Sequence, residues 1–451
     1  MHIPGYDATY LRQTWSASKT FRRVLIAVSV YAVLRLLMQF ALAAIPEFFP
    51  DDLRIYLDAA RNLQHGQALY PTLPLERMEF YQYAPSFALV FRPFVWLPRT
   101  LAALLHTLLH VVIYVLLYAE WDRLFRQFGM ERARVMLARA LPVWLVFSAF
   151  WNDMAFLNVY LLMALLATLL IDAVLNERLG WSLLWLSVIL QIKPQWAFAV
   201  AIPLLLGRYR FFFKLVALAV MAYAAVIGVT LLAVGPTYGW QQYREYLHLL
   251  TSIGNTYPWR GPDKPYLGYN HSIVQTVIYI VGIRQVALDL ALAIRAVLLA
   301  PLATIGLRCL LHPPSRRGSD ASLVGLDLAF ALYTGAFIWL DVVWELSLGI
   351  ALFTYLLATL EDRTTRKLLW AIFLVYALVD AWQIVSFLVF GEAAIAPGPY
   401  VLTDPSIYVP LIMIVTVFFY ALLVRRLWAA VAYAPRQISY VQEEPLADIS
   451  P

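Results

Sequence analysis

The stretch VLIAVSVYAVLRLLMQFALAAI, residues 24–45, decides the fold class of this chain. A transmembrane α-helix needs roughly 20 consecutive, mostly apolar residues, and this stretch meets that length. Lys19, Arg22 and Arg23 precede it. Because basic residues flank spans on the cytoplasmic side, they predict a cytoplasmic N-terminus. The first 20 residues are polar and lack the apolar core of a signal peptide, so we expect residues 24–45 to remain as a membrane anchor.

Comparable apolar runs recur along nearly the whole sequence. Hydrophobic residues make up 62% of the chain and charged residues only 14%, whereas soluble domains carry about 25% charged residues. The mean hydropathy is +0.70. A membrane β-barrel would show alternating segments of about 10 residues, but these runs are long and unbroken, which favours helices. The later runs lie at 83–97, 100–119, 135–151, 153–175, 181–206, 211–234, 272–283, 286–307, 322–341, 343–360, 367–391 and 406–424.

These runs predict an all-α polytopic integral membrane protein with eleven to thirteen membrane helices. We expect one transmembrane domain over residues 1–431 and a short polar cytoplasmic tail over 432–451. The net charge of +6 comes mainly from short basic loops beside the runs, as expected for cytoplasmic loops rather than for a nucleic-acid-binding protein.

The charge distribution also predicts the orientation. Placing the basic loops and both termini in the cytoplasm puts a first loop, 46–82, and a large loop, 235–271, outside. The scheme requires runs 83–97 and 100–119 together to cross once, and likewise 272–283 and 286–307. Either one member of each pair is re-entrant, or the basic segment 123–134 is extracytoplasmic.

Two local features refine this topology. Leu53, Tyr56, Leu57, Ala60 and Leu63 recur at helical spacing, which predicts a short amphipathic helix at the membrane surface, ended near Gly66. Lys193-Pro194 interrupts the run 181–206, and proline removes a helix hydrogen bond. We therefore expect two short helices that meet at Lys193 on the extracytoplasmic side.

Uncommon polar side chains gather on the extracytoplasmic side of this scheme. Asp51 and Asp52 directly follow the first span. One interpretation is that they cap the amphipathic helix. The other is that one of them is a general base, because a carboxylate near the membrane takes a proton from an attacking hydroxyl group. The cations available to stabilise a departing phosphate are Arg54, Lys193, Arg260 and Lys264.

Motifs of several other enzyme classes are missing. Asp51-Asp52 lacks the spacing of the D-x-D motif found in many enzymes that use nucleotide sugars. The chain also has neither a glycine-rich phosphate loop nor a nucleophile elbow, so a cytosolic nucleotide donor has no visible site. His106 and His110 lack the glutamate of a zinc protease motif and are interpreted as core residues. We therefore expect a metal-independent reaction that uses a donor already in the membrane, namely a polyprenyl-phosphate sugar as a co-substrate.

The chain resembles the GT-C superfamily and, within it, glycosyltransferase family 87, which includes polyprenol-phosphate-mannose-dependent mannosyltransferases. The similarity rests on short elements spread over residues 46–275. These are Asp52-Leu53-Arg54-Ile55-Tyr56, Gly66 with Leu69-Tyr70, Tyr83-Ala84-Pro85, Leu97-Pro98, Ile192-Lys193-Pro194 and Asn270-His271-Ser272. Two elements differ: the family's G-Q-x-N stands here as Ala155-Phe156-Leu157-Asn158, and its tryptophan–histidine element is replaced near Trp344-Glu345.

The resemblance implies Asp52 as the catalytic base, with Asp51 as an alternative. It further implies that substrates contact a set of polar residues: Tyr56, Tyr83, Asn158, Lys193, Arg260, Lys264, Asn270, His271 and Ser272.

The implied reaction is an inverting, metal-independent transfer of a sugar, with mannose as the expected sugar, to an extracytoplasmic lipid or glycan acceptor. The expected partners are the polyprenyl-phosphate sugar, that acceptor and membrane lipids, with no nucleic acid. The expected location is a bacterial-type plasma membrane. Transfer of arabinofuranose from its polyprenyl phosphate, and transport of lipid-linked sugars by a flippase, remain the alternatives.

Overall fold

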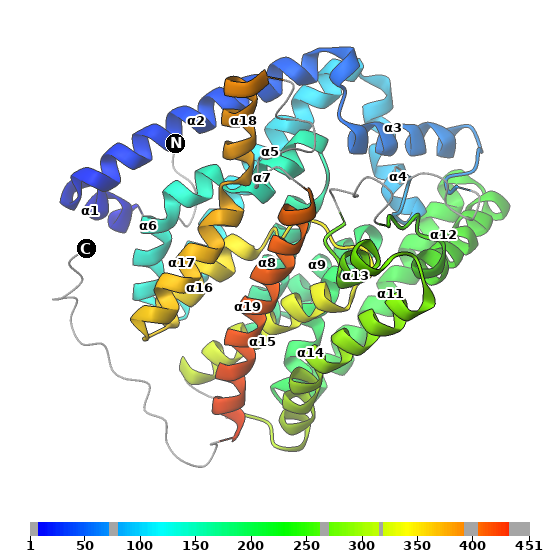
Figure 1. The fold of residues 1–451 in the computed structure, drawn as a ribbon. Helices are drawn as coiled ribbons and strands as arrows, with labels where there is room; N and C mark the ends of the chain where they lie inside the picture. The colour runs from blue at the N-terminus through cyan, green and yellow to red at the C-terminus, as the bar shows by residue number, and fades with distance from the viewer. Residues whose placement is uncertain (1–7, 72–79, 262–269, 315–318, 392–404, 433–451) are drawn as a thin grey trace.

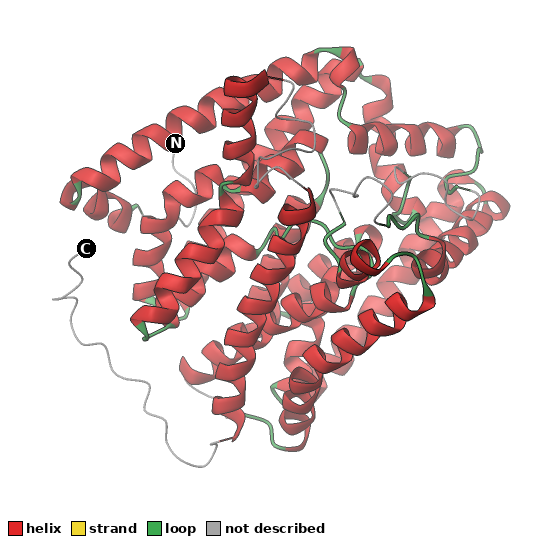
Figure 2. Cartoon of the chain, viewed as in Figure 1, coloured by secondary structure: helices red, strands yellow, loops and turns green. Residues whose placement is uncertain are grey.

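The computed structural model describes residues 8–71, 80–261, 270–314, 319–391 and 405–432. Throughout these residues the regular elements are helices, and no strand occurs (Figure 2). The predicted all-α fold is confirmed.

Among the described residues, six helices are long and apolar enough to cross a membrane, so the chain is a polytopic membrane protein. Several of them run alongside one another in Figure 1. They are α2 (Lys19–Ala44), α5 (Arg99–Gln127), α11 (Tyr209–Val234), α14 (Gln285–Leu311), α15 (Ser319–Trp339) and α19 (Pro405–Ala432).

In the described part of the chain, two further pairs of helices are each long and apolar enough to cross a membrane when the two members are taken together. One pair bends by 42° where Phe147 adopts an extended conformation, and the other bends by 49° at Leu378. Their members are α6 (Glu131–Val146) with α7 (Ser148–Phe156), and α17 (Arg363–Ala377) with α18 (Val379–Phe390).

Shorter apolar helices complete the membrane part. They are α8 (Tyr160–Leu175), α9 (Leu179–Ile192), η3 (Pro194–Val200) with α10 (Ala201–Leu205), and α16 (Gly349–Thr359). Within the described residues, the expected eleven to thirteen membrane helices are reached only when these short helices and the bent pairs are included. The break between α9 and η3 lies at Lys193, as predicted.

Two of the predicted apolar runs are too short to cross a membrane. The run 83–97 forms α4 (Pro85–Phe91) and η2 (Arg92–Trp96), and the run 272–283 forms α13 (Ile273–Val281). At 1.5 Å per residue, a helix of nine residues is only about 14 Å long, against an apolar layer of about 30 Å. For each pair of runs that must together cross the membrane once, the longer helix, α5 or α14, is therefore the one that crosses.

The remaining elements are α1 (Thr9–Ala17), η1 (Pro46–Phe48), α3 (Asp51–Gln64) and α12 (Pro236–Thr256). Helix α3 is the predicted amphipathic helix, and Gly66 follows its end with a φ of +68°, which favours glycine. Its apolar side chains are buried, and the helix packs against α4 and η2. The apolar face of α3 therefore contacts protein, whereas the sequence predicted contact with the membrane surface.

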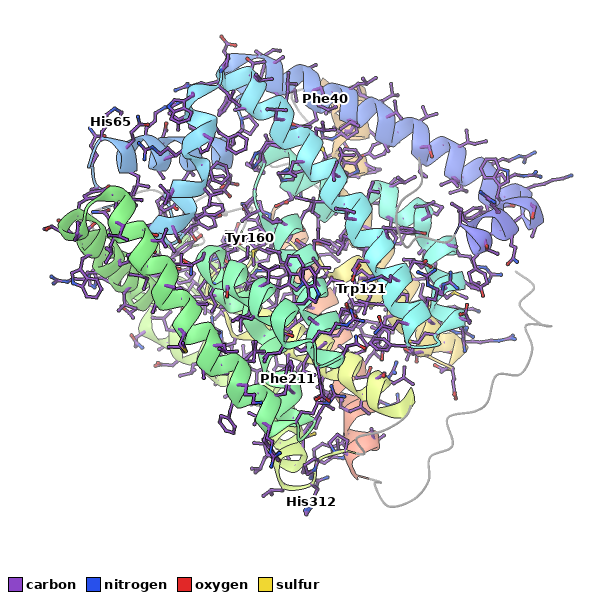
Figure 3. The ribbon with its side chains drawn as sticks, turned by 180° about the vertical axis from the view of Figure 1, so that it is seen from behind. Phe40, His65, Trp121, Tyr160, Phe211 and His312 are labelled. Carbon is purple, nitrogen blue, oxygen red and sulfur yellow. The ribbon has the colours of Figure 1, made fainter. Side chains whose placement is uncertain are left out.

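The core surrounds α8 and α16, whose side chains are buried along almost their whole length. Helix α8 packs against α5 and α9, while α15 packs against α19. In contrast, α2, α11 and α14 expose apolar side chains such as Leu34, Leu232 and Val297, as expected for lipid-facing helices. Tyr160, at the start of α8, lies near the centre of the molecule in Figure 3.

Candidate active site

Helix α3 begins so that its two aspartates face different surroundings. Pro50 occupies the N-cap position, and no side chain accepts a capping hydrogen bond there, so the capping interpretation of the aspartates is wrong. Asp51 is half-exposed and forms an ion pair with Arg54, one turn along the same helix. Asp52 is partly buried and turns toward the protein interior, where it meets Asn158.

The carboxylate of Asp52 is held by one amide group. Asn158 Nδ2 donates a 2.7 Å hydrogen bond to Asp52 Oδ2. The amide cannot be reversed, because Asn158 Oδ1 accepts hydrogen bonds from the Tyr56 hydroxyl at 3.1 Å and from the backbone N–H of Val159 at 2.7 Å. The Tyr83 hydroxyl lies 3.0 Å from that of Tyr56. Four residues predicted to form the site, Asp52, Tyr56, Tyr83 and Asn158, are thus in direct contact.

A strained turn presents Asn158 to this site. Leu157, which ends α7, adopts the left-handed conformation with a φ of +52°. That conformation costs roughly 1–2 kcal/mol for a residue other than glycine, asparagine or aspartate. Leu157 is fully buried, so packing holds it in place. The strain turns the chain directly from α7 into α8, which leaves the Asn158 side chain pointing toward α3.

Lys193 lies in the break between α9 and η3 and approaches the same site. Its Nζ donates a hydrogen bond to the Tyr160 hydroxyl at 3.2 Å. The ammonium also lies 4.3 Å from the ring centre of Tyr160 and 5.0 Å from that of Tyr83, within the range of cation–π attraction. Lys193 is only 6% exposed. A buried cation therefore lies close enough to Asp52 for the two charges to interact.

Burial raises the pKa of Asp52 from 3.8 to about 7. The loss of water is the largest cause, since it disfavours the charged carboxylate. The positive charge of Lys193 and the hydrogen bond from Asn158 act in the opposite direction, while the carboxylate of Asp153 raises the pKa further. A carboxylate with a pKa close to neutral is suited to accept a proton in catalysis.

The predicted Asn270-His271-Ser272 element forms a second part of the site. All three residues are fully buried, and Asn270 and His271 form hydrogen bonds with an irregular segment, 340–348, that precedes α16. Asn270 Oδ1 accepts hydrogen bonds from the N–H groups of Val343 and Ser272, both at 3.1 Å. Ser272 Oγ accepts from Gln275 N and so caps α13. Asn270 and Ser272 therefore organise the backbone at this position.

Within this second part, Glu345 is buried and accepts two hydrogen bonds. Asn152 Nδ2 donates to Glu345 Oε1, and the Tyr376 hydroxyl donates to Oε2, both at 2.7 Å. His271 Nε2 lies 3.8 Å from Oε1. Burial lowers the pKa of His271 to about 3, so this imidazole is neutral and the contact is not an ion pair.

Trp344 connects the two parts of the site. Its ring stacks on Tyr160, with a centroid distance of 6.0 Å and an interplanar angle of 19°. Tyr160 in turn contacts Lys193. The irregular segment 340–348 is thereby placed next to the cation.

The structure does not bring every predicted residue into the cluster. Arg260 is half-buried, and its backbone carbonyl accepts a hydrogen bond from Gln275 Nε2. Lys264 lies outside the described residues. Conversely, the sequence did not indicate Tyr160, which contacts the amine of Lys193. Its position two residues after Asn158, at the start of an apolar run, was the available signal.

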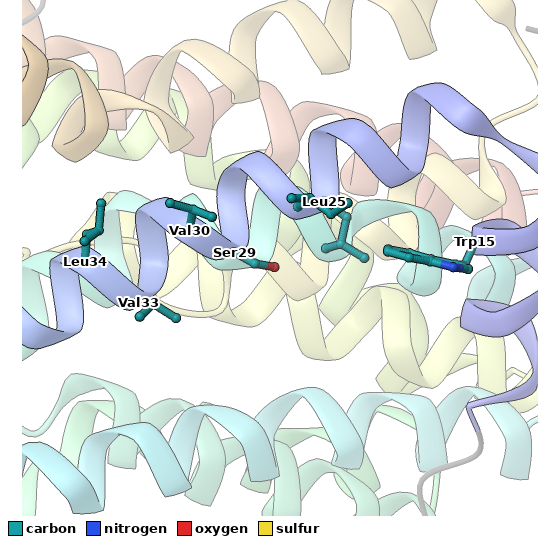
Figure 4. Close-up of a pocket in the computed structure, with 7 residues that line it drawn as sticks. Trp15, Leu25, Ser29, Val30, Val33 and Leu34 are labelled. Atoms are coloured by element: carbon teal, nitrogen blue, oxygen red, sulfur yellow. The ribbon is translucent and has the colours of Figure 1, made fainter.

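An open hollow on the surface lies elsewhere and lacks charged groups for catalysis. It occupies about 410 Å³ between α1 and the outer side of α2, where its lining residues carry no charge (Figure 4). They are Trp15, Leu25, Ile26, Ser29, Val30, Val33 and Leu34. The described residues also contain no group of three His, Cys, Asp or Glu side chains placed to bind a metal ion.

Comparison with known protein families matches residues 81–339 to glycosyltransferase family 87. No curated protein matches the chain. The matched region covers more than half of the chain and contains Tyr83, Asn158, Lys193 and the 270–272 element. It begins after α3, so Asp52 lies outside it. The chain therefore belongs to glycosyltransferase family 87, whose members transfer sugars.

Proposed function

We propose that this protein is an inverting glycosyltransferase that moves a sugar from a polyprenyl phosphate to a lipid or glycan acceptor. The observation that carries the proposal is the contact of the partly exposed Asp52 with Asn158, beside the buried cation of Lys193. Mannose as the sugar rests on the resemblance alone. The extracytoplasmic position of the site in a bacterial-type plasma membrane, with both termini in the cytoplasm, rests on the charge distribution along the sequence.

In the proposed reaction, the acceptor hydroxyl attacks the anomeric carbon of the sugar and transfers its proton to Asp52. The new carbon–oxygen bond forms as the bond from the anomeric carbon to the phosphate oxygen breaks. The lipid phosphate leaves with that electron pair, and the ammonium of Lys193 stabilises its charge. A phosphate leaving group needs little protonation, so one carboxylate suffices and no metal ion takes part.

The test is a transfer assay with protein purified in detergent. The enzyme receives radiolabelled polyprenyl-phosphate mannose and a membrane glycolipid extract in the presence of EDTA. We expect label in a new product from the wild type and none from Asp52→Asn. The matched control is Asp58→Asn, on the same helix, where the half-exposed carboxylate only pairs with Arg61. Asp51→Asn, beside it, separates the roles of the two aspartates.

Each outcome leads to a different conclusion. Full activity in Asp52→Asn, with loss in Asp51→Asn, would move the base to the exposed aspartate. Transfer only from polyprenyl-phosphate arabinofuranose would change the donor sugar and leave the enzyme class. Donor binding without transfer of either sugar, together with movement of the lipid across vesicle membranes, would replace the enzyme by a flippase.

A further inference from the structure

His110, on the spanning helix α5, makes two hydrogen bonds that together determine its charge. Its Nδ1 lies 2.9 Å from the backbone oxygen of His106, and its Nε2 lies 2.7 Å from the backbone oxygen of Asn158. A carbonyl oxygen only accepts hydrogen bonds, whereas a neutral imidazole has a single N–H. Both contacts are satisfied together only when His110 is an imidazolium cation.

A buried carboxylate lies beside this ring as its counterion. Asp153, on α7, is fully buried, and its Oδ2 lies 3.5 Å from His110 Nε2. The same carboxylate accepts hydrogen bonds from the backbone N–H groups of Tyr160 and Leu161, at 3.2 and 2.9 Å. These groups open α8, where the helix dipole favours a negative charge. Buried charges are tolerated when they are paired and hydrogen-bonded, as they are here.

The pair encloses the turn that carries Asn158. Asp153 contributes its backbone oxygen, which accepts a 3.1 Å hydrogen bond from Asn158 N. His110 binds the carbonyl oxygen of Asn158 on the other side. The backbone of Asn158 is therefore held at both its N–H and its C=O, next to the strained residue Leu157. With its backbone held in this way, its side-chain amide is directed at Asp52.

We propose that the buried His110–Asp153 ion pair is a positioning device, which holds the Asn158 turn so that its amide orients the catalytic carboxylate. The effect of this ion pair on the reaction rests on the proposed function, whereas the charge state of the pair is independent of it. Both residues are buried, so their contacts reach the site through the Asn158 turn, and the negative charge of Asp153 also acts on Asp52 directly.

The direct test is ¹⁵N NMR of protein labelled at histidine, with the His110 signal assigned by its loss in His110→Gln. We expect both ring nitrogens of His110 to be protonated at neutral pH, in the wild type and equally in the inactive Asp52→Asn protein. An unprotonated ring nitrogen would overturn the proposal. Because Asp52→Asn is included, this result stands whether or not the protein transfers sugar.

The kinetic test uses the asparagine variant of His110. An asparagine side chain at this position is too short to reach the Asn158 carbonyl, so His110→Asn should lower kcat about tenfold and leave the donor KM within about twofold. The acid limb of the pH profile should also move to higher pH, since a looser Asn158 amide stabilises the ionised base less. His106→Gln, one turn earlier on α5, is the control and should preserve kcat. An unchanged kcat in His110→Asn would contradict the proposal.

A double-mutant cycle isolates the ion pair. His110→Gln retains an N–H for the Asn158 carbonyl but leaves Asp153 without its cation, and Asp153→Asn leaves His110 without its anion. Each single variant should lose activity, and the neutral double variant should recover much of that loss because no charge stays unpaired. Additive losses would show that the two residues act separately and would overturn the pairing.

Discussion

Asn158 Nδ2 donates its hydrogen bond to Asp52 Oδ2 from a turn that lies 106 residues further along the chain. Because Asn158 Oδ1 is already engaged by Tyr56 and by the N–H of Val159, the amide offers only its donor to the carboxylate. The contact therefore favours the ionised form of Asp52, which a general base requires.

The first prediction concerns the pH dependence of the wild type. Burial raises the pKa of Asp52 to about 7, and a base is active only when it has lost its proton. Activity should therefore fall about tenfold per pH unit below that pKa. It should also decline above about pH 8, because burial lowers the pKa of Lys193 to about 8 and the ammonium loses its proton there. Initial rates between pH 5 and 9 measure both limbs. A midpoint of the acid limb near 3.8, the ordinary value for aspartate, would contradict the desolvated environment.

The second prediction concerns the amide of Asn158. Asn158→Ala removes a hydrogen bond that stabilises the charged carboxylate, so the acid limb should move to higher pH. Hydrogen bonds to charged groups contribute about 1.5–3 kcal/mol, which corresponds to a loss of roughly tenfold to a hundredfold in rate at neutral pH. The pH profile of kcat checks both effects. A uniform loss of rate at every pH would mean that Asn158 does not act through Asp52.

The third prediction concerns the charge of Lys193. Lys193→Met introduces an apolar side chain of similar length and removes the cation proposed to stabilise the lipid phosphate. We expect kcat/KM for the donor to fall about 100-fold, as for the loss of one electrostatic contact to developing charge. Steady-state kinetics against the donor measure it. Lys214→Met, at an exposed position on α11, is the control and should behave like the wild type.

The fourth prediction concerns stability, at a buried ion pair between α2 and α18. Arg35 Nε lies 3.3 Å from Asp380 Oδ2, both side chains are almost fully buried, and the Tyr31 hydroxyl donates to the same oxygen at 2.5 Å. Asp380→Ala leaves a buried cation unpaired, which typically costs about 3–5 kcal/mol. The apparent Tm in detergent should drop clearly.

Two companion variants make this prediction specific. Asp289→Asn, at an exposed position on α14, should leave the Tm unchanged. The double variant Arg35→Met with Asp380→Leu should be more stable than Asp380→Ala, because it removes both charges together. Equal losses in the single and double variants would show that the pair does not join α2 to α18.

Several elements were predictable because their signals are local. The amphipathic pattern of residues 53–63 and the glycine at 66 specify α3 and its end. The break at Lys193 follows from the proline beside it. The apolar run 343–360 was less predictable, because helix α16 begins only at Gly349 and the residues before it are irregular. Tertiary contacts, such as the hydrogen bond from Leu346 N to the Tyr376 hydroxyl, satisfy its irregular backbone, and such partners cannot be read from a local pattern.

The choice between Asp51 and Asp52 shows the same limit. Both are aspartates in the first turn of one helix, and local chemistry does not distinguish them. Only the packing of α3 against α4 and η2 turns one carboxylate toward Asn158 and leaves the other half-exposed beside Arg54. His110 is a further case. Its apolar neighbours in the sequence made His110 resemble a core residue, because its partner Asp153 lies on another helix.

By itself, the sequence determined that this chain is a helical membrane protein, because long apolar runs satisfy their backbone groups in lipid only as helices. It also determined which rare polar residues were candidates, since ionisable groups beside membrane spans are costly unless they serve a purpose. Tertiary structure alone decided which of them meet. The ends of α3, α7, α8 and α9 converge from distant parts of the chain, and burial at that point sets the pKa of Asp52.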